Sequence, residues 1–287
     1  MNVVLLNGFY MATDRRVGPW STVGGTVSQE QINNANIVRS FFTNEGWTIN
    51  AIAGLLGNMM AESTINPAII QATNRWRLPH NAQNLTDVPN SIMQNFYMEY
   101  YGDLRKAYAI GLCQWDGYSQ RGNLKRQKLV AFAEDNNIIW YDGWTQLYRI
   151  KGEQAYDIDN NKTSFFRPVR YNGITYTFAN YPTSTASPEI LAAAWAAGYE
   201  RNAGGTGYRD TNARWWYDFF TTDPTAPAII DPQDFLEPLE EDPDLPPFDP
   251  DDPVPPDESQ PDKWPPWYLA LLSIQHRKEL KRRCQRM

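Results

Sequence analysis

The sequence predicts an α+β fold that is predominantly helical, with a small β-hairpin element, followed by an extended segment without a core. Apolar residues recur at helical spacing in several stretches between residues 28 and 220. The pair Asn172-Gly173, which separates two runs of aromatic and apolar residues, is a strong short-range hairpin signature. From Pro224 to Pro266 the chain holds 14 of its 21 prolines, a composition that cannot form a packed domain.

Turns, prolines and charges divide the chain into four segments. Residues 1–27 are expected to form an irregular N-terminal arm with one short strand, and residues 28–222 form the folded domain. Residues 223–263 form an acidic, proline-rich linker, because residues 231–262 carry 13 acids and no base. Residues 264–287 are first aromatic and then basic, so the overall charge of −7 describes no single part of the molecule.

The helices expected in the domain begin at recognisable caps. Ser28 and Gln31 have capping-box spacing before a helical apolar stripe that ends near residues 44–46. Thr48 caps the next helix, which Pro67 cannot continue. Further helices are expected near residues 91–101, 122–136, 140–149, 189–199 and 213–220, with a strand at residues 3–6, a long loop at 71–95 and a strand or hairpin at 107–117.

The supply of histidine and cysteine limits the chemistry. The chain has two histidines, His80 and His276, and two cysteines, Cys113 and Cys284, and the two members of each pair are far apart in sequence. No group has the spacing of zinc ligands, and little is left for a Ser-His or Cys-His nucleophile. We therefore expect no metal and no cofactor.

Glu62 is the first candidate for catalysis. It follows Ile52, Leu55 and Met59 on one face of the helix that begins after Thr48, which is the face that a helix buries. A carboxyl group in apolar company tends to have a raised pKa and can act as a general acid. The alternative is a glutamate that points into water or pairs with an arginine, for which the candidates are Arg75, Arg121 and Arg201.

Three further groups have both a structural and a functional interpretation. The stretch Gly111-Leu-Cys-Gln-Trp115 could be a buried strand or the wall of a cleft, in which Gln114 offers a donor and an acceptor. Asp116 could be a second carboxylate, although Asp-Gly is also an ordinary turn pair. Glu200 and Arg201 are expected to form a structural ion pair.

The combination of these stretches is more specific than any one of them. The run from Gly46 to Pro67 with Glu62-Ser-x-x-x-Pro, the run Gly111-Leu-Cys-Gln-Trp115, Lys-Leu-Val-Ala-Phe-Ala at residues 128–133 and Ala-Ala-Ala-Trp-Ala-Ala-Gly-Tyr-Glu-Arg at 192–201 resemble the phage tail lysozyme family. The resemblance covers about residues 28–220. It implies a lysozyme-like fold in which Glu62 is the proton donor, and in which Tyr108, Ser63, Gln114 and Trp115 line the sugar groove.

The function that this resemblance implies is cleavage of the peptidoglycan glycan strand between N-acetylmuramic acid and N-acetylglucosamine during genome entry. The chemistry is open between a hydrolase, with Asp116 as a possible second acid, and a lytic transglycosylase, in which the substrate's own hydroxyl attacks. The alternative is a structural or wall-binding tail protein whose lysozyme-like domain is inactive.

The expected partners follow from the same resemblance and from the two ends of the chain. Besides peptidoglycan, we expect other phage tail proteins to bind residues 223–287, with residues 1–27 as a second candidate contact, in the tail tip or interior of a virion. No specific nucleic acid is predicted. Contact of the basic C-terminal segment with anionic lipid is a third hypothesis.

Overall fold

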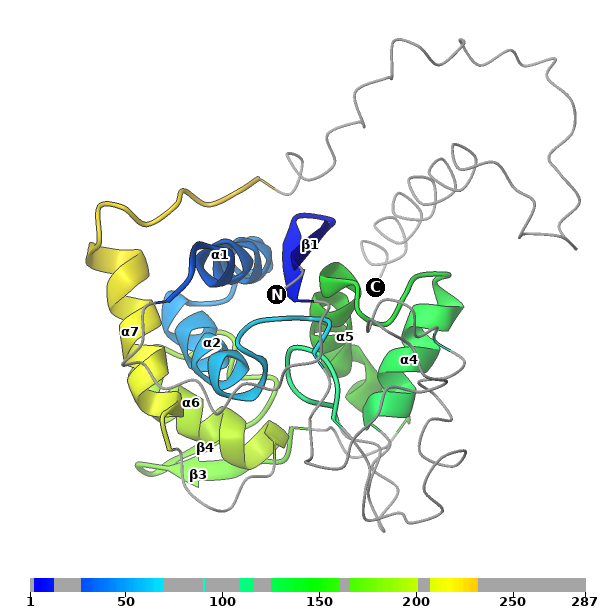
Figure 1. The fold of residues 1–287 in the computed structure, drawn as a ribbon. Helices are drawn as coiled ribbons and strands as arrows, with labels where there is room; N and C mark the ends of the chain where they lie inside the picture. Colours follow the sequence, from blue (N-terminus) through cyan, green and yellow to red (C-terminus); the bar gives the residue numbers. More distant parts are fainter. Residues whose placement is uncertain are drawn as a thin grey trace, which may run out of the picture.

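The computed structural model describes residues 3–12, 27–69, 90, 109–115, 125–160, 166–200 and 207–231 (Figure 1). These residues form six α-helices, one π-helical turn and two antiparallel two-stranded sheets. The prediction of a mostly helical domain with small hairpins is confirmed. None of the helices in this part of the chain combines the length and hydropathy that a bilayer crossing needs.

The first two helices begin at the predicted caps. Helix α1 (Gln29–Asn44) starts at Ser28, whose side chain accepts from the Gln31 amide while the Gln31 side chain accepts from the Ser28 amide. Helix α2 (Ile49–Ser63) starts at Thr48, which accepts from the amide of Ala51. Local side chain to backbone bonds therefore determine both starting points.

Helix α2 is the centre of the domain and packs against α1, α6 (Pro188–Trp195) and α7 (Arg209–Thr222) (Figure 1). Two glycines allow the close approach. A Cβ added at Gly54 would lie 2.9 Å from the Leu191 Cβ of α6, and one at Gly57 would lie 2.4 Å from the Arg209 carbonyl oxygen of α7. Because both neighbours touch the α2 backbone, their positions are fixed relative to its C-terminal end.

The N-terminal residues 3–12 are a hairpin, which corrects the prediction of an irregular arm. The predicted strand β1 (Val3–Leu6) is present, and it pairs with β2 (Phe9–Ala12) through the turn Asn7-Gly8. Phe9 is fully buried against Gly143 and Trp144 of α5 (Gly143–Asn160). The arm is therefore part of the domain core over these residues.

The remaining elements largely match the expectations. Helix α4 (Lys125–Asp135) lies within the predicted range 122–136, whereas α5 runs beyond the predicted end at 149 and α7 begins earlier than predicted. Strands β3 (Val169–Tyr171) and β4 (Ile174–Tyr176) pair around Asn172-Gly173, where both residues have positive φ. That backbone is the one which the Asn-Gly signature predicts.

Residues 223–231, assigned by sequence to the start of the linker, are held along α1 (Figure 1). Asn36 donates to the carbonyl of Ala228 and Arg39 to that of Pro227, while the amide of Ile230 donates to Ser40 Oγ. We call these nine residues the α1 strap. The predicted loop at 71–95 falls outside the described residues except for Asn90, and the predicted helix at 91–101 lies entirely outside them.

Candidate active site

Glu62 is the penultimate residue of α2 and the only charged residue of that helix. Ile52, Leu55 and Met59 share its face and are fully buried, as predicted, whereas the Glu62 side chain remains 13% exposed. The carboxyl group of Glu62 therefore lies at the end of a buried apolar helix face and is itself partly exposed to solvent.

The chain leaves α2 through two consecutive left-handed residues. Thr64 has φ 56° and Ile65 has φ 59°, and their amides donate to the carbonyls of Met60 and Met59. A β-branched residue rarely adopts positive φ, so the surrounding structure must hold Ile65 there. Ile65 is fully buried and its carbonyl accepts from Asn34 of α1. This sharp exit ends α2 at Ser63, one residue after Glu62.

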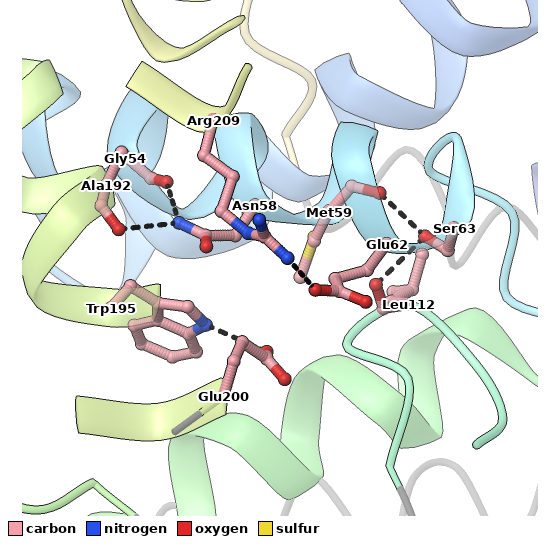
Figure 2. Close-up of polar contacts among 10 residues, drawn as sticks. All are labelled: Gly54, Asn58, Met59, Glu62, Ser63, Leu112, Ala192, Trp195, Glu200 and Arg209. Carbon is pink, nitrogen blue, oxygen red and sulfur yellow. Dashed lines mark hydrogen bonds and ion pairs between the residues drawn. The ribbon is translucent and has the colours of Figure 1, made fainter. Parts of the chain in front are cut away.

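Arg209, the first residue of α7, is the ion-pair partner of Glu62. Its Nη2 donates to Glu62 Oε1 and its side chain is only 6% exposed (Figure 2). The close contact at Gly57 places the start of α7 against α2, which brings the guanidinium to the carboxylate. The three arginines suggested by sequence, Arg75, Arg121 and Arg201, lie outside the described residues.

Glu200 is the second carboxyl group of the site. It ends a π-helical turn (Ala196–Glu200) that continues α6 without a break. Trp195 Nε1 donates to Glu200 Oε1 at 3.3 Å, and Figure 2 shows Glu62 and Glu200 reaching toward the same space from α2 and from this turn. Because a π-turn widens the helix, it changes the direction in which the last side chain points.

The surroundings of Glu200 favour its neutral form. Desolvation by burial is the largest effect and raises the pKa of Glu200 to about 8, and the negative charge of Glu62 adds to it. The positive charges of Lys125 and Arg209 and the hydrogen bond from Trp195 act in the opposite direction and are outweighed. At neutral pH the site therefore contains a carboxyl group that carries a proton.

A tight loop packs against the end of α2. Residues 110–115 close on themselves through a single bridge between Ile110 and Trp115, so the predicted strand or hairpin is reduced here to one pair of backbone hydrogen bonds. Ser63 Oγ donates to the carbonyls of Met59 and Leu112, both at 2.9 Å (Figure 2). The residue next to Glu62 therefore ties the loop to the helix.

Gln146 of α5 holds the same loop from the other side. Its Oε1 accepts from the amide of Leu112, and its Nε2 donates to the carbonyls of Pro67 and Trp140. Gly111 has φ 73°, and a Cβ there would lie 2.6 Å from Gln146 Oε1. Sequence reasoning missed Gln146, because one amide on the buried face of a helix gives no distinctive pattern.

The residues predicted to line the sugar groove differ from one another in how far they are buried. Gln114 has φ 46°, is partly buried, and donates from Nε2 to the carbonyl of Gly111. Trp115 is 1% exposed and donates from Nε1 to the hydroxyl of Tyr199, so its ring fills the core behind the loop. Ser63 is buried and its hydroxyl is engaged with two carbonyls. Tyr108 and Asp116 lie outside the described residues.

Sequence reasoning missed the roles of Arg209 and Glu200. Nothing in the residues around Arg209 marks it, because its partner lies 147 positions away. The sequence predicts a structural ion pair between Glu200 and Arg201. Arg201 lies outside the described residues, and the charges that act on Glu200 come from α2, α4 and α7. A glutamate that follows a run of alanine and aromatic residues is itself a sign of a buried carboxyl group, and this pattern is the signal in the sequence that points to Glu200.

Comparison with known proteins adds two findings. Residues 33–220 match the family described as phage tail lysozyme. The chain is also 30% identical over 194 residues to Morphogenesis protein 1 of Bacillus phage B103, an alignment that covers 67% of this chain and 40% of the relative. The matched region runs from α1 to α7 and contains Glu62, Glu200 and Arg209.

Proposed function

The chain belongs to the phage tail lysozyme family, and on that premise we propose that it is a tail-associated peptidoglycan hydrolase. It cleaves the β-1,4 linkage between N-acetylmuramic acid and N-acetylglucosamine and so opens the host wall locally during genome entry. The observation that carries the proposal is the position of Glu62, a partly accessible carboxyl group near the end of an otherwise uncharged helix, beside a second carboxyl group.

Glu62 is the proton donor in this proposal. Its proton passes to the glycosidic oxygen as the bond to the anomeric carbon breaks, which removes the negative charge that would otherwise build up on the leaving group. Arg209 bonds the carboxyl group directly, and Ser63 ties the loop at residues 110–115 to the last turn of α2, which carries Glu62. Gln114 is partly exposed and remains a candidate sugar contact. Trp115 is buried and supports the loop through its hydrogen bond to Tyr199.

The test is the variant Glu62→Gln on purified peptidoglycan, with the melting temperature measured alongside. Loss of lysis with a melting temperature near that of the wild type supports the proposal, since an amide keeps the shape of the side chain but cannot donate the proton. Glu45→Gln is the matched control, because Glu45 lies at the end of α1 and pairs with Lys151 on the surface. Full activity of Glu62→Gln would reject Glu62 as the proton donor, whereas absence of lysis by the wild type would favour an inactive, structural domain.

The products distinguish two versions of the chemistry. A hydrolase releases reducing ends, because water attacks the anomeric carbon. A lytic transglycosylase releases anhydro-sugars, because the substrate's own hydroxyl attacks. Mass spectrometry of the digest separates the two, and Asp116 enters as a second acid only in the hydrolytic version.

Association with the tail rests on the family, which is described as phage tail lysozyme. The chain spans 40% of the length of Morphogenesis protein 1, so its place in a virion and its tail partners are part of the proposal. We assign tail docking to the part of residues 223–287 that follows the α1 strap, with residues 1–27 as a second contact. Incorporation of the enzyme into particles, measured with and without residues 232–287, tests this assignment.

A further inference from the structure

The ion pair between Glu62 and Arg209 engages one oxygen of the carboxyl group. Arg209 Nη2 donates to Glu62 Oε1, and among the described residues no other hydrogen bond joins the two side chains. Arg209 Nε, which could complete a two-point contact, is buried and has no hydrogen-bond partner in this part of the chain. The arginine therefore leaves Oε2 of Glu62 unbonded.

A second pair between an arginine and a glutamate shows the other geometry. Arg214, also on α7, donates from Nε to Glu189 Oε1 at 2.6 Å and from Nη2 to Glu189 Oε2 at 2.8 Å. Both oxygens of that carboxylate are occupied, as in the usual two-point pair. The side chains of Arg214 and Glu189 are 42% and 34% exposed, against 6% and 13% for Arg209 and Glu62. The less exposed pair is thus the one in which the arginine leaves a carboxyl oxygen available.

Helix packing fixes the place from which Arg209 reaches the carboxyl group. Arg209 is the first residue of α7, and a Cβ added at Gly57 of α2 would collide with its carbonyl oxygen. Glu62 lies further along the same α2 helix, so the two charged side chains come from backbones that touch. Figure 2 shows Arg209 reaching one oxygen of Glu62 while the other oxygen is directed away from it.

We propose that Arg209 is a positioning residue for the reaction, which holds Oε1 of Glu62 so that Oε2 carries the proton and delivers it to the glycosidic oxygen. This inference rests on the proposed function. A guanidinium group donates hydrogen bonds and accepts none, so Oε1 must be the acceptor. The carbonyl oxygen of a protonated carboxyl group is the better acceptor of its two oxygens. The contact with Arg209 therefore places the proton of Glu62 on Oε2.

The proton balance closes at this one atom. As the glycosidic bond breaks, the proton leaves Glu62 Oε2 and bonds to the leaving oxygen. The hydroxyl group that attacks the anomeric carbon, from water or from the sugar, loses its proton to Oε2, which restores the starting state. Arg209 keeps its own protons and its bond to Oε1 throughout, so it acts through Glu62 and not on the sugar.

The first experiment measures kcat and KM of Arg209→Gln on purified peptidoglycan, with the full-length chain and well below the melting temperature of each protein. The carboxyl group can rotate once the arginine is gone, so kcat should fall by about 10- to 100-fold. KM should stay near the wild-type value, because the lost contact is not made with the substrate. Arg209→Lys should keep more activity than Arg209→Gln, since its ammonium group still donates. Arg214→Gln, on the same helix, is the matched control and should keep the wild-type kcat.

A second pair of variants displaces Arg209 without replacing it. In Gly57→Ala the new Cβ meets the Arg209 carbonyl and Ala213, which should push the start of α7 away from α2 and lower kcat. Gly54→Ala is the matched control, because its Cβ meets Leu191 of α6 instead. Both variants should lose stability through overpacking, but only Gly57→Ala should lose turnover at a temperature where both are folded.

The outcomes separate this inference from the function itself. If Glu62→Gln is inactive while folded Arg209→Gln keeps the wild-type kcat, the inference is wrong and the proposed function stands. If Gly54→Ala lowers kcat as much as Gly57→Ala, the loss reflects packing in general, and the inference is again rejected. Should Arg209→Gln fail to fold, the two glycine variants decide. Absence of lysis by the wild type would instead reject the proposed function.

Discussion

Replacing Glu200 by glutamine should make the protein more stable in alkaline solution. Glutamine resembles the protonated glutamate, so the variant keeps the neutral form that the surroundings favour. The folded protein holds the pKa of Glu200 at about 8, chiefly through desolvation, against 4.5 for the ordinary side chain. The folded state therefore binds this proton more tightly than the unfolded state, and wild-type stability must fall as the pH rises between these two values.

The size of the effect follows from the same two values. At about 1.4 kcal/mol per pKa unit, the interval from 4.5 to about 8 corresponds to a loss on the order of 4 to 5 kcal/mol in the free energy of unfolding. The wild type suffers this loss between acidic and alkaline solution, and Glu200→Gln does not. The two proteins should have similar stability near pH 4.5 and should differ most above pH 8.

Urea denaturation at a series of pH values measures this difference directly. Glu189→Gln serves as a control of opposite sign. Burial raises the pKa of Glu189, but its hydrogen bonds with Arg214, its backbone and Ser187 outweigh that effect and lower it. In the wild type, the ionised Glu189 therefore stabilises the folded state at neutral pH, and this contribution is lost in acid. If Glu200→Gln differs from the wild type by a constant amount at all pH values, or is the less stable protein above pH 8, the protonated state assigned to Glu200 is wrong.

Three further predictions concern the supports of the site. Arg209→Met should lower the free energy of unfolding at neutral pH by about 3–5 kcal/mol, seen by urea denaturation, because the nearly buried Glu62 loses its partner. Gly57→Ala should cost about 1–3 kcal/mol and lower the melting temperature, since the new Cβ would clash with the Arg209 carbonyl. A chain ending at residue 231 should keep the wild-type melting temperature and lytic activity, whereas one ending at 223 should melt lower, because Asn36 and Arg39 lose their backbone acceptors.

Features that depend on neighbouring residues could be predicted from the sequence. The capping box at Ser28, the Thr48 cap and the Asn172-Gly173 turn are each determined by a few adjacent side chains, and all three are confirmed. Asn7-Gly8 has the same signature as Asn172-Gly173 and forms an equivalent hairpin with both residues at positive φ. The N-terminal hairpin is therefore also determined by adjacent residues.

Features that depend on distant residues could not be predicted. The Glu62–Arg209 pair joins positions 147 residues apart, and only the packing of α7 on Gly57 brings them together. The π-turn at Ala196–Glu200 departs from the 3.6-residue period used to assign the helix, so its effect on the direction of Glu200 was also hidden. Glu62 itself could be found because its apolar face lies within a single helix.

The α1 strap has a mechanical consequence. Any pull on the chain beyond residue 231 reaches the strap before it reaches α7. The backbone groups of Ala228, Pro227 and Ile230 are bonded to Asn36, Arg39 and Ser40 of α1, and these three side chains belong to buried residues. Force applied from the C-terminal side is then borne first by α1, and Arg209 at the far end of α7 keeps its place beside Glu62. We expect an enzyme tethered through its C-terminal side to keep its site intact under load until the strap is peeled away.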